Sequence, residues 1–98
     1  MSWFSSPSAS RSQSVSHREL VKAGALLLDV RTPDEYAQGH VPGARNLPVH
    51  ELPARLGELM QDQHVVVYCR SGARSASARA ILTHAGFAVT DIGSIANW

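Results

Sequence analysis

Residues 64–75 read HVVVYCRSGARS, and this stretch decides the fold and holds Cys69, the only cysteine of the chain. The valines within it follow one another without polar alternation, as expected of a strand that is covered on both faces. An alanine-rich segment at 73–85 follows and predicts a helix. Cys69 is therefore expected where a buried strand turns into a helix.

The start of a helix is a favourable place for an anion. Its first backbone N–H groups have no acceptors within the helix, and the helix dipole adds partial positive charge at the same end. Arg70 and Arg74 bring full positive charges close to Cys69 in the sequence. The stretch therefore predicts a lowered pKa for the Cys69 thiol, and with it a reactive thiolate.

The composition is that of one globular domain and argues against several classes of protein. With 44% hydrophobic residues and a formal net charge of +1, the 98 residues offer no basic stripe for a nucleic acid. The five histidines show no metal-ligand spacing and no glycine-rich nucleotide motif is present, so we expect neither a metal nor a cofactor. No apolar stretch reaches the roughly 20 residues of a membrane span. A lone cysteine suits a reducing compartment, and we expect a soluble, cytoplasmic protein.

Residues 1–15 are rich in serine and lack hydrophobic periodicity. We expect them to form a flexible tail that precedes a folded domain at 16–98. Two alternatives remain for this segment. Trp3 and Phe4 could dock on the domain or on a partner, or the serines and arginines could form an organellar transit peptide.

Short strands and helices alternate along the predicted domain. Capping boxes start two short helices, while leucine spacing and an alanine-rich run indicate two longer ones; the predicted helices span about 16–23, 32–38, 51–61 and 73–85. Gly86 is predicted to be the C-cap of the last helix. The predicted strands span 25–30, 45–47, 64–68 and 87–91. This order is typical of a small α/β domain with a mostly parallel sheet.

Charged or nucleophilic residues stand at the ends of two predicted strands. Asp29 and Arg31 follow the first strand, and Cys69 follows the third. Because ligands of parallel sheets bind beyond the carboxyl ends of the strands, these residues should share one crevice. We expect Asp29 and Arg31 to support the site structurally, paired with one another, with Glu35 or with Arg45.

Three stretches of the chain together resemble the single-domain rhodaneses, the thiosulfate sulfurtransferase family. They are LLDVRTPDEY at 27–36, GHVPGARN at 39–46 and VVYCRSGARS at 66–75. The resemblance implies a parallel sheet of about five strands flanked by helices, and a cysteine that alternates between thiolate and persulfide. By this analogy, Cys69 attacks the outer sulfur of thiosulfate and releases sulfite. A nucleophilic acceptor, such as cyanide or a thiol, then takes the sulfur.

The loop that follows the cysteine carries the anion-binding residues in this interpretation. Gly72 lets the backbone turn its amides toward one point, which makes a nest for a persulfide anion. Arg70 and Arg74 present guanidinium forks to the sulfonate oxygens of the donor; the alternative for each is solvation or a structural ion pair. Ser71 and Ser75 donate hydroxyls to the anion or cap the next helix, and for Ser75 we expect the cap. The predicted anion-binding set is Arg70, Ser71, Gly72, Ala73, Arg74 and Ser75.

Three function classes fit a thiolate in such a loop. The first is a sulfurtransferase with a small-molecule donor and acceptor, and a protein thiol as a further acceptor. The second is a cysteine phosphatase or arsenate reductase, whose loop has one residue more than the four that separate Cys69 from Arg74. A shorter loop makes a smaller ring of amides, which suits one sulfur atom better than a tetrahedral phosphate. The third class is a persulfide carrier or regulatory module that passes sulfur to one protein.

Overall fold

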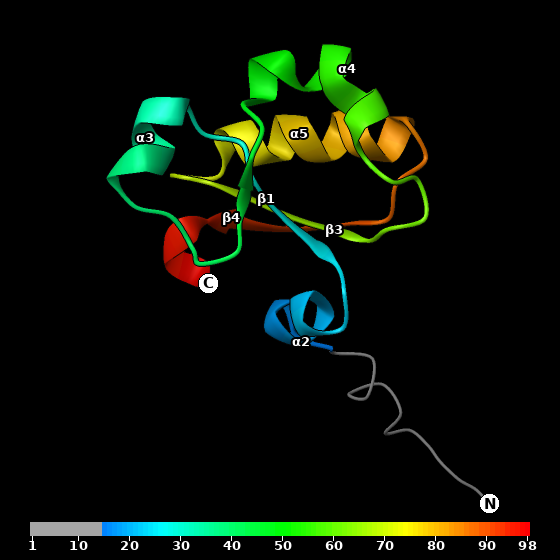
Figure 1. Ribbon diagram of the computed structural model, residues 1–98, viewed down its shortest axis with the longest axis horizontal. Helices are drawn as coiled ribbons and strands as arrows, with labels where there is room; N and C mark the ends of the chain where they lie inside the picture. The colour runs from blue at the N-terminus through cyan, green and yellow to red at the C-terminus, as the bar shows by residue number, and fades with distance from the viewer. Residues whose placement is uncertain (1–14) are drawn as a thin grey trace, which may run out of the picture.

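The computed structural model describes residues 15–98 as a parallel sheet between helices. The sheet has the order β2-β1-β3-β4, and its strands are β1 (Leu26–Asp29), β2 (Arg45–Asn46), β3 (Val65–Cys69) and β4 (Val89–Ser94). The α-helices are α2 (His17–Lys22), α3 (Pro33–Gln38), α4 (Leu52–Arg55) and α5 (Ala73–His84), and the 3-10 turns are η2 (Val49–Glu51), η3 (Leu56–Glu58) and η4 (Ile95–Asn97). Helices α4 and α5 cover one face of the sheet, and α2 lies on the other (Figure 1).

The expected α/β class with a parallel sheet is confirmed, but the expected number of about five strands is wrong for the described residues. Residues 15–98 form four strands, and every strand pair is parallel. The four strands correspond to the four predicted strand segments, and residues 15–98 contain no further apolar run that could form a fifth strand. The predicted flexible tail at 1–15 lies, except for Val15, outside the described residues.

Strand β3 is the centre of the core because both of its faces are covered. Val65, Val67 and Cys69 point into a cluster with residues of α5, while Val66 and Tyr68 belong to a second cluster on the α2 side. All five residues of β3 are completely buried. Each fully buried valine of this kind contributes roughly 1.5–3 kcal/mol relative to an exposed one. The apolar run that predicted a doubly covered strand is therefore confirmed.

Both predicted capping boxes are present and fix where α2 and α3 begin. The Ser16 hydroxyl accepts a hydrogen bond from the backbone amide of Glu19, and the Thr32 hydroxyl accepts one from the backbone amide of Glu35. In each case the glutamate also accepts the backbone amide of the capping residue, so two otherwise unpaired donors are satisfied. Helix α5 ends at His84, one residue before the predicted end at 85, and its C-cap is Ala85 rather than the predicted Gly86.

The predicted helix at 51–61 is wrong as a single element. The segment is divided into η2, the single turn of α4, and η3. Pro53 has no backbone N–H to continue the preceding turn, and Gly57 lowers the helix propensity of the following one. Leucine spacing located the buried side of this segment, since Leu52 is completely buried, but it could not reveal that the helix is interrupted.

The last strand is displaced by about two residues from its predicted position at 87–91. Phe87 is buried in the connection before β4, and the strand continues to Ser94. The pairing with β3 shifts between Val67 and Tyr68, which leaves one extra residue on β4 and brings Ser94 opposite Cys69. A β-bulge of this kind is invisible to a period-two pattern. No helix among residues 15–98 is long and apolar enough to cross a membrane.

Candidate functional site

Cys69 is the last residue of β3, and the loop after it leads directly into α5. Its residue surface is completely buried. The backbone N–H of Gly72, the N-cap of α5, donates a hydrogen bond of 3.0 Å to the Cys69 Sγ. The sulfur therefore lies at the N-terminus of the longest helix, as the sequence predicted.

The surroundings of Cys69 favour the thiolate. Burial raises the pKa of the Cys69 thiol, but hydrogen bonds from the amide and hydroxyl of Ser75 and from the amides of Gly72 and Ser71 outweigh it, so the pKa is lowered. The Ser75 hydroxyl also lies 3.1 Å from the Gly72 carbonyl oxygen and 3.4 Å from that of Gly93, so its single proton has competing acceptors. The backbone amides are thus the fixed donors of the site.

Two glycines with positive φ meet where the cysteine loop passes β4. Gly72 has a φ of 108°, and Gly93, at the bulge, has a φ of 76°. A Cβ built on Gly72 would lie 3.8 Å from the Gly93 Cα. Gly72 also provides the N-cap of α5 without a side-chain hydrogen bond, so the expectation that Ser75 caps this helix is wrong. Ser75 is the third residue of the helix, and its hydroxyl points back toward the turn.

Asp29 and Arg31 form a buried ion pair with one another rather than with Glu35 or Arg45. The Arg31 Nη2 lies 2.7 Å from the Asp29 Oδ2, and both side chains are nearly inaccessible, at 8% and 0% exposure. The Asp29 carboxylate also accepts the Arg31 backbone amide, and Arg31 donates to the Gly39 carbonyl oxygen at 2.7 Å. These bonds fasten the loop after α3 to the end of β1.

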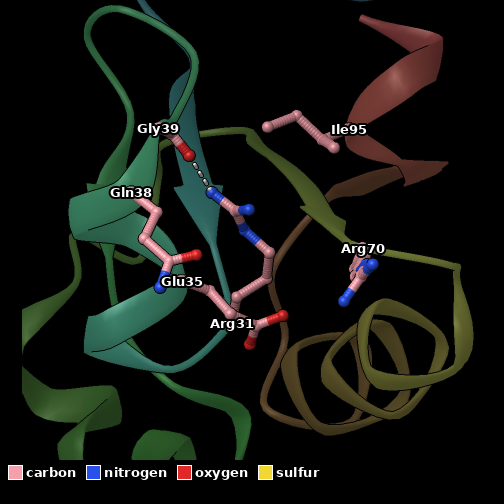
Figure 2. A pocket seen from close by; sticks show the side chains of 6 residues that line it. All are labelled: Arg31, Glu35, Gln38, Gly39, Arg70 and Ile95. Atoms are coloured by element: carbon pink, nitrogen blue, oxygen red, sulfur yellow. Dashed lines mark hydrogen bonds between the residues drawn. The ribbon is translucent and has the colours of Figure 1, made fainter.

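A cavity of about 300 Å³ opens beside this pair. It is lined by Arg31, Glu35, Gln38, Gly39, Arg70 and Ile95. Figure 2 shows Glu35 and Gln38 projecting from α3 on one side, Arg70 on the opposite side next to α5, and Ile95 at the edge formed by the C-terminal turn. Arg31 and Arg70, from the loops that follow β1 and β3, both line the cavity, as expected for a crevice at the carboxyl ends of parallel strands. The completely buried Asp29 and Cys69 lie behind these two residues in the sequence and are not among the residues that line it.

The two loop arginines have different surroundings. Arg70 is exposed, lines the cavity and has no carboxylate within salt-bridge distance among residues 15–98. Arg74 instead forms a two-pronged ion pair with Glu35, with N–O distances of 2.6 and 3.0 Å. The sequence offered a structural ion pair as the alternative for both arginines, and the structure has one for Arg74.

Glu35 lines the cavity, whereas the sequence indicated only a capping box and an alternative ion-pair partner at this position. Hydrogen bonds from Arg74, followed by those from Thr32, lower the pKa of the Glu35 carboxyl to about 2. Its position as the fourth residue of a capping box identified it as a helix-start residue, and this signal also implied a fixed carboxylate near the end of β1.

Among residues 15–98, no group of three or more His, Cys, Asp or Glu side chains could hold a metal ion.

A comparison with protein families matches residues 14–98 to the rhodanese-like domain. The chain belongs to this family. Its relatives include a sulfurtransferase of Allochromatium vinosum, 49% identical over 78% of this chain and 71% of the relative. Thiosulfate sulfurtransferase 16, chloroplastic, of Arabidopsis thaliana is 37% identical over 92% of this chain and 86% of the relative.

Solved rhodanese structures resemble this rhodanese-like domain as well. A structure described as rhodanese with anions from E. coli superposes with a TM-score of 0.71 at 33% identity, covering 76% of this chain and 92% of that one. Other matching chains are much longer, and this chain spans as little as 14% of one of them. The family assignment and the names of the relatives support a rhodanese-type sulfurtransferase, and the fold resemblance that the sequence indicated is confirmed.

Proposed function

We propose that this protein transfers sulfur from thiosulfate or a similar donor to a nucleophilic acceptor through a persulfide on Cys69. The observation that carries the proposal is the Cys69 Sγ at the N-terminus of α5, where loop amides stabilise its thiolate. The thiolate attacks the outer sulfur of the donor and forms a new S–S bond. The S–S bond of the donor breaks, and sulfite leaves with the electron pair.

The second half of the reaction regenerates the thiolate. A nucleophile such as cyanide or a thiolate attacks the terminal sulfur of the persulfide, and the Cys69 sulfur leaves as the thiolate. The amides of Ser71, Gly72 and Ser75 converge on the site and hold the anion in both halves. The loop 70–75 is thus the anion-binding segment, with Ala73 contributing backbone only.

Arg70 is the arginine that we assign to direct contact with the donor. It lines the cavity, and its guanidinium is free of ion pairs with the described residues, so it can present its fork to sulfonate oxygens. Arg74 adds its charge from within the Glu35 pair, and a direct contact with the donor requires that pair to open. Asp29 and Arg31 support the wall of the cavity through their buried pair.

The compartment and the partners follow from the same chemistry. The only thiol must stay reduced between turnovers, which favours a reducing compartment such as the cytoplasm. A cavity of about 300 Å³ admits a small sulfur donor and a small acceptor, and a protein thiol is the alternative acceptor. Neither a nucleic acid nor a membrane has a part in this reaction.

The test measures thiosulfate-to-cyanide transfer and the mass of the protein after exposure to thiosulfate. We expect a mass gain of one sulfur atom at Cys69 and steady turnover with cyanide. Cys69→Ser should lose both while it keeps the unfolding midpoint, because a hydroxyl is a far weaker nucleophile at neutral pH. Transfer that survives in Cys69→Ser, or hydrolysis of phosphate esters or reduction of arsenate by the wild type, would overturn the proposal. A persulfide that forms but is released only to a protein thiol would identify a carrier instead.

A further inference from the structure

Arg31 and Arg70 line the cavity, and Arg74 is bound to Glu35 in its wall; the described residues compensate only two of these three arginines. Arg31 is paired with Asp29 and Arg74 with Glu35, whereas Arg70 has no such partner within residues 15–98. With the Cys69 thiolate included, three positive charges face three negative ones. The charges of the site therefore balance before any donor arrives, although its amides and arginines are arranged for an anion.

The Glu35 carboxylate accepts hydrogen bonds from four donors, which fix its position. Its Oε1 accepts the backbone amide of Thr32 at 3.0 Å and the Thr32 hydroxyl at 3.1 Å. The same carboxylate accepts both prongs of Arg74, and its side chain is 23% exposed. Four donors from the starts of two helices thus fix one negative charge in the cavity wall, opposite Arg70 (Figure 2).

We propose that Glu35 sets the charge preference of this site by compensating Arg74, and so lowers its preference for doubly charged thiosulfate over singly charged sulfane donors of the thiosulfonate class. Without Glu35, the charge of Arg74 would add to that of Arg70 and favour the dianion. The donor preference rests on the proposed function, whereas the compensation of Arg74 by Glu35 affects how anions reach Cys69 whatever reaction it catalyses. Arg31, Arg70 and Arg74 are the cations that face Glu35.

The variant that tests this inference is Glu35→Gln. Glutamine can replace glutamate in a capping box and can still accept one hydrogen bond from Arg74, so the variant removes the charge and retains most of the geometry. Asp34→Asn is the matched control, because Asp34 is an exposed acidic residue in the first turn of α3 and does not line the cavity. Both variants change the net charge of the protein by the same amount.

The first measurement compares alkylation of Cys69 by iodoacetate, which is an anion, with alkylation by neutral iodoacetamide. We expect Glu35→Gln to raise the ratio of the two rates about two- to five-fold at low ionic strength, and added salt to reduce this change. Arg74→Gln, which leaves the Glu35 charge uncompensated, should lower the ratio. The double variant should return it close to that of the wild type, while Asp34→Asn should not change it.

The second measurement compares two donors that differ by one charge, thiosulfate and methanethiosulfonate. The ratio of their kcat/KM values, thiosulfate over methanethiosulfonate, should rise in Glu35→Gln by a factor similar to that of the alkylation ratio, and fall in Arg74→Gln. If both variants slow both reagents and both donors equally, Glu35 has only a structural role and the inference is overturned. A shifted alkylation ratio in a protein that transfers no sulfur would retain the charge role and refute the proposed function instead.

Discussion

Replacing Gly72 with alanine should lower the stability of the fold and also change the reactivity of the Cys69 thiol. Gly72 has a φ of 108°, a conformation that residues with a Cβ rarely adopt. The new methyl group would meet the Gly93 Cα at 3.8 Å, an ordinary contact, so crowding is not the main cost. Holding alanine in this conformation costs about 1–3 kcal/mol. For a domain of this size, such a loss lowers the Tm by roughly 5–15 °C.

Rotation about the Gly72 φ relieves this strain, and it turns the peptide whose N–H donates to the cysteine. The Gly72 N–H lies 3.0 Å from the Cys69 Sγ, and its loss removes one of the donors that lower the pKa of the thiol. A hydrogen bond to a charged group contributes at least about 1.5 kcal/mol, the equivalent of roughly one tenfold step. We therefore expect the pH of half-maximal Cys69 alkylation to rise by about one unit, and the rate on the acid side of this titration to fall by about tenfold.

Gly24→Ala is the matched control for this experiment. Gly24 has a φ of 116°, nothing lies within 4 Å of a Cβ built on it, and it follows α2 on the face of the sheet opposite α5. The control should lose a similar amount of stability, measured by thermal or urea unfolding, and keep the alkylation profile of the wild type. The reasoning is refuted if both variants change the thiol equally, or if Gly72→Ala keeps the wild-type rate and profile.

Two further predictions concern the ion pairs that border the cavity. Because Arg74 and Thr32 lower the pKa of Glu35 from 4.5 to about 2, the Glu35 carboxylate should stabilise the fold above about pH 4.5 and lose this contribution as the pH falls toward 2. The difference in Tm between the wild type and Arg74→Gln should therefore shrink over that interval, and a difference that stays constant would contradict it. Asp29→Ala should lower the free energy of unfolding by about 3–5 kcal/mol, since it leaves the Arg31 charge buried without a partner. Urea unfolding measures this loss, and Arg55→Gln, in an exposed ion-pair cluster, should change the stability much less.

Local signals in the sequence predicted the features that depend on nearest neighbours. The two capping boxes and the doubly covered strand each rest on fewer than ten consecutive residues, the cysteine at the start of α5 rests on the adjoining runs at 64–85, and each is confirmed. The leucine spacing does not show the division of the 51–61 segment, which Pro53 and Gly57 cause within the segment itself, and a period-two pattern does not show the bulge in β4, which depends on the pairing with β3.

The Glu35–Arg74 pair joins residues 39 positions apart, and no local pattern predicts it. It follows, however, from the topology. Strands β1 and β3 are parallel neighbours, and the loops that lead from them into α3 and α5 are both three residues long, 30–32 and 70–72. Equal loops after adjacent parallel strands bring the first turns of both helices to the same level of the sheet edge. The carboxylate that caps one helix then lies where it can accept an arginine from the first turn of the other, so a residue identified as a cap becomes part of the cavity wall.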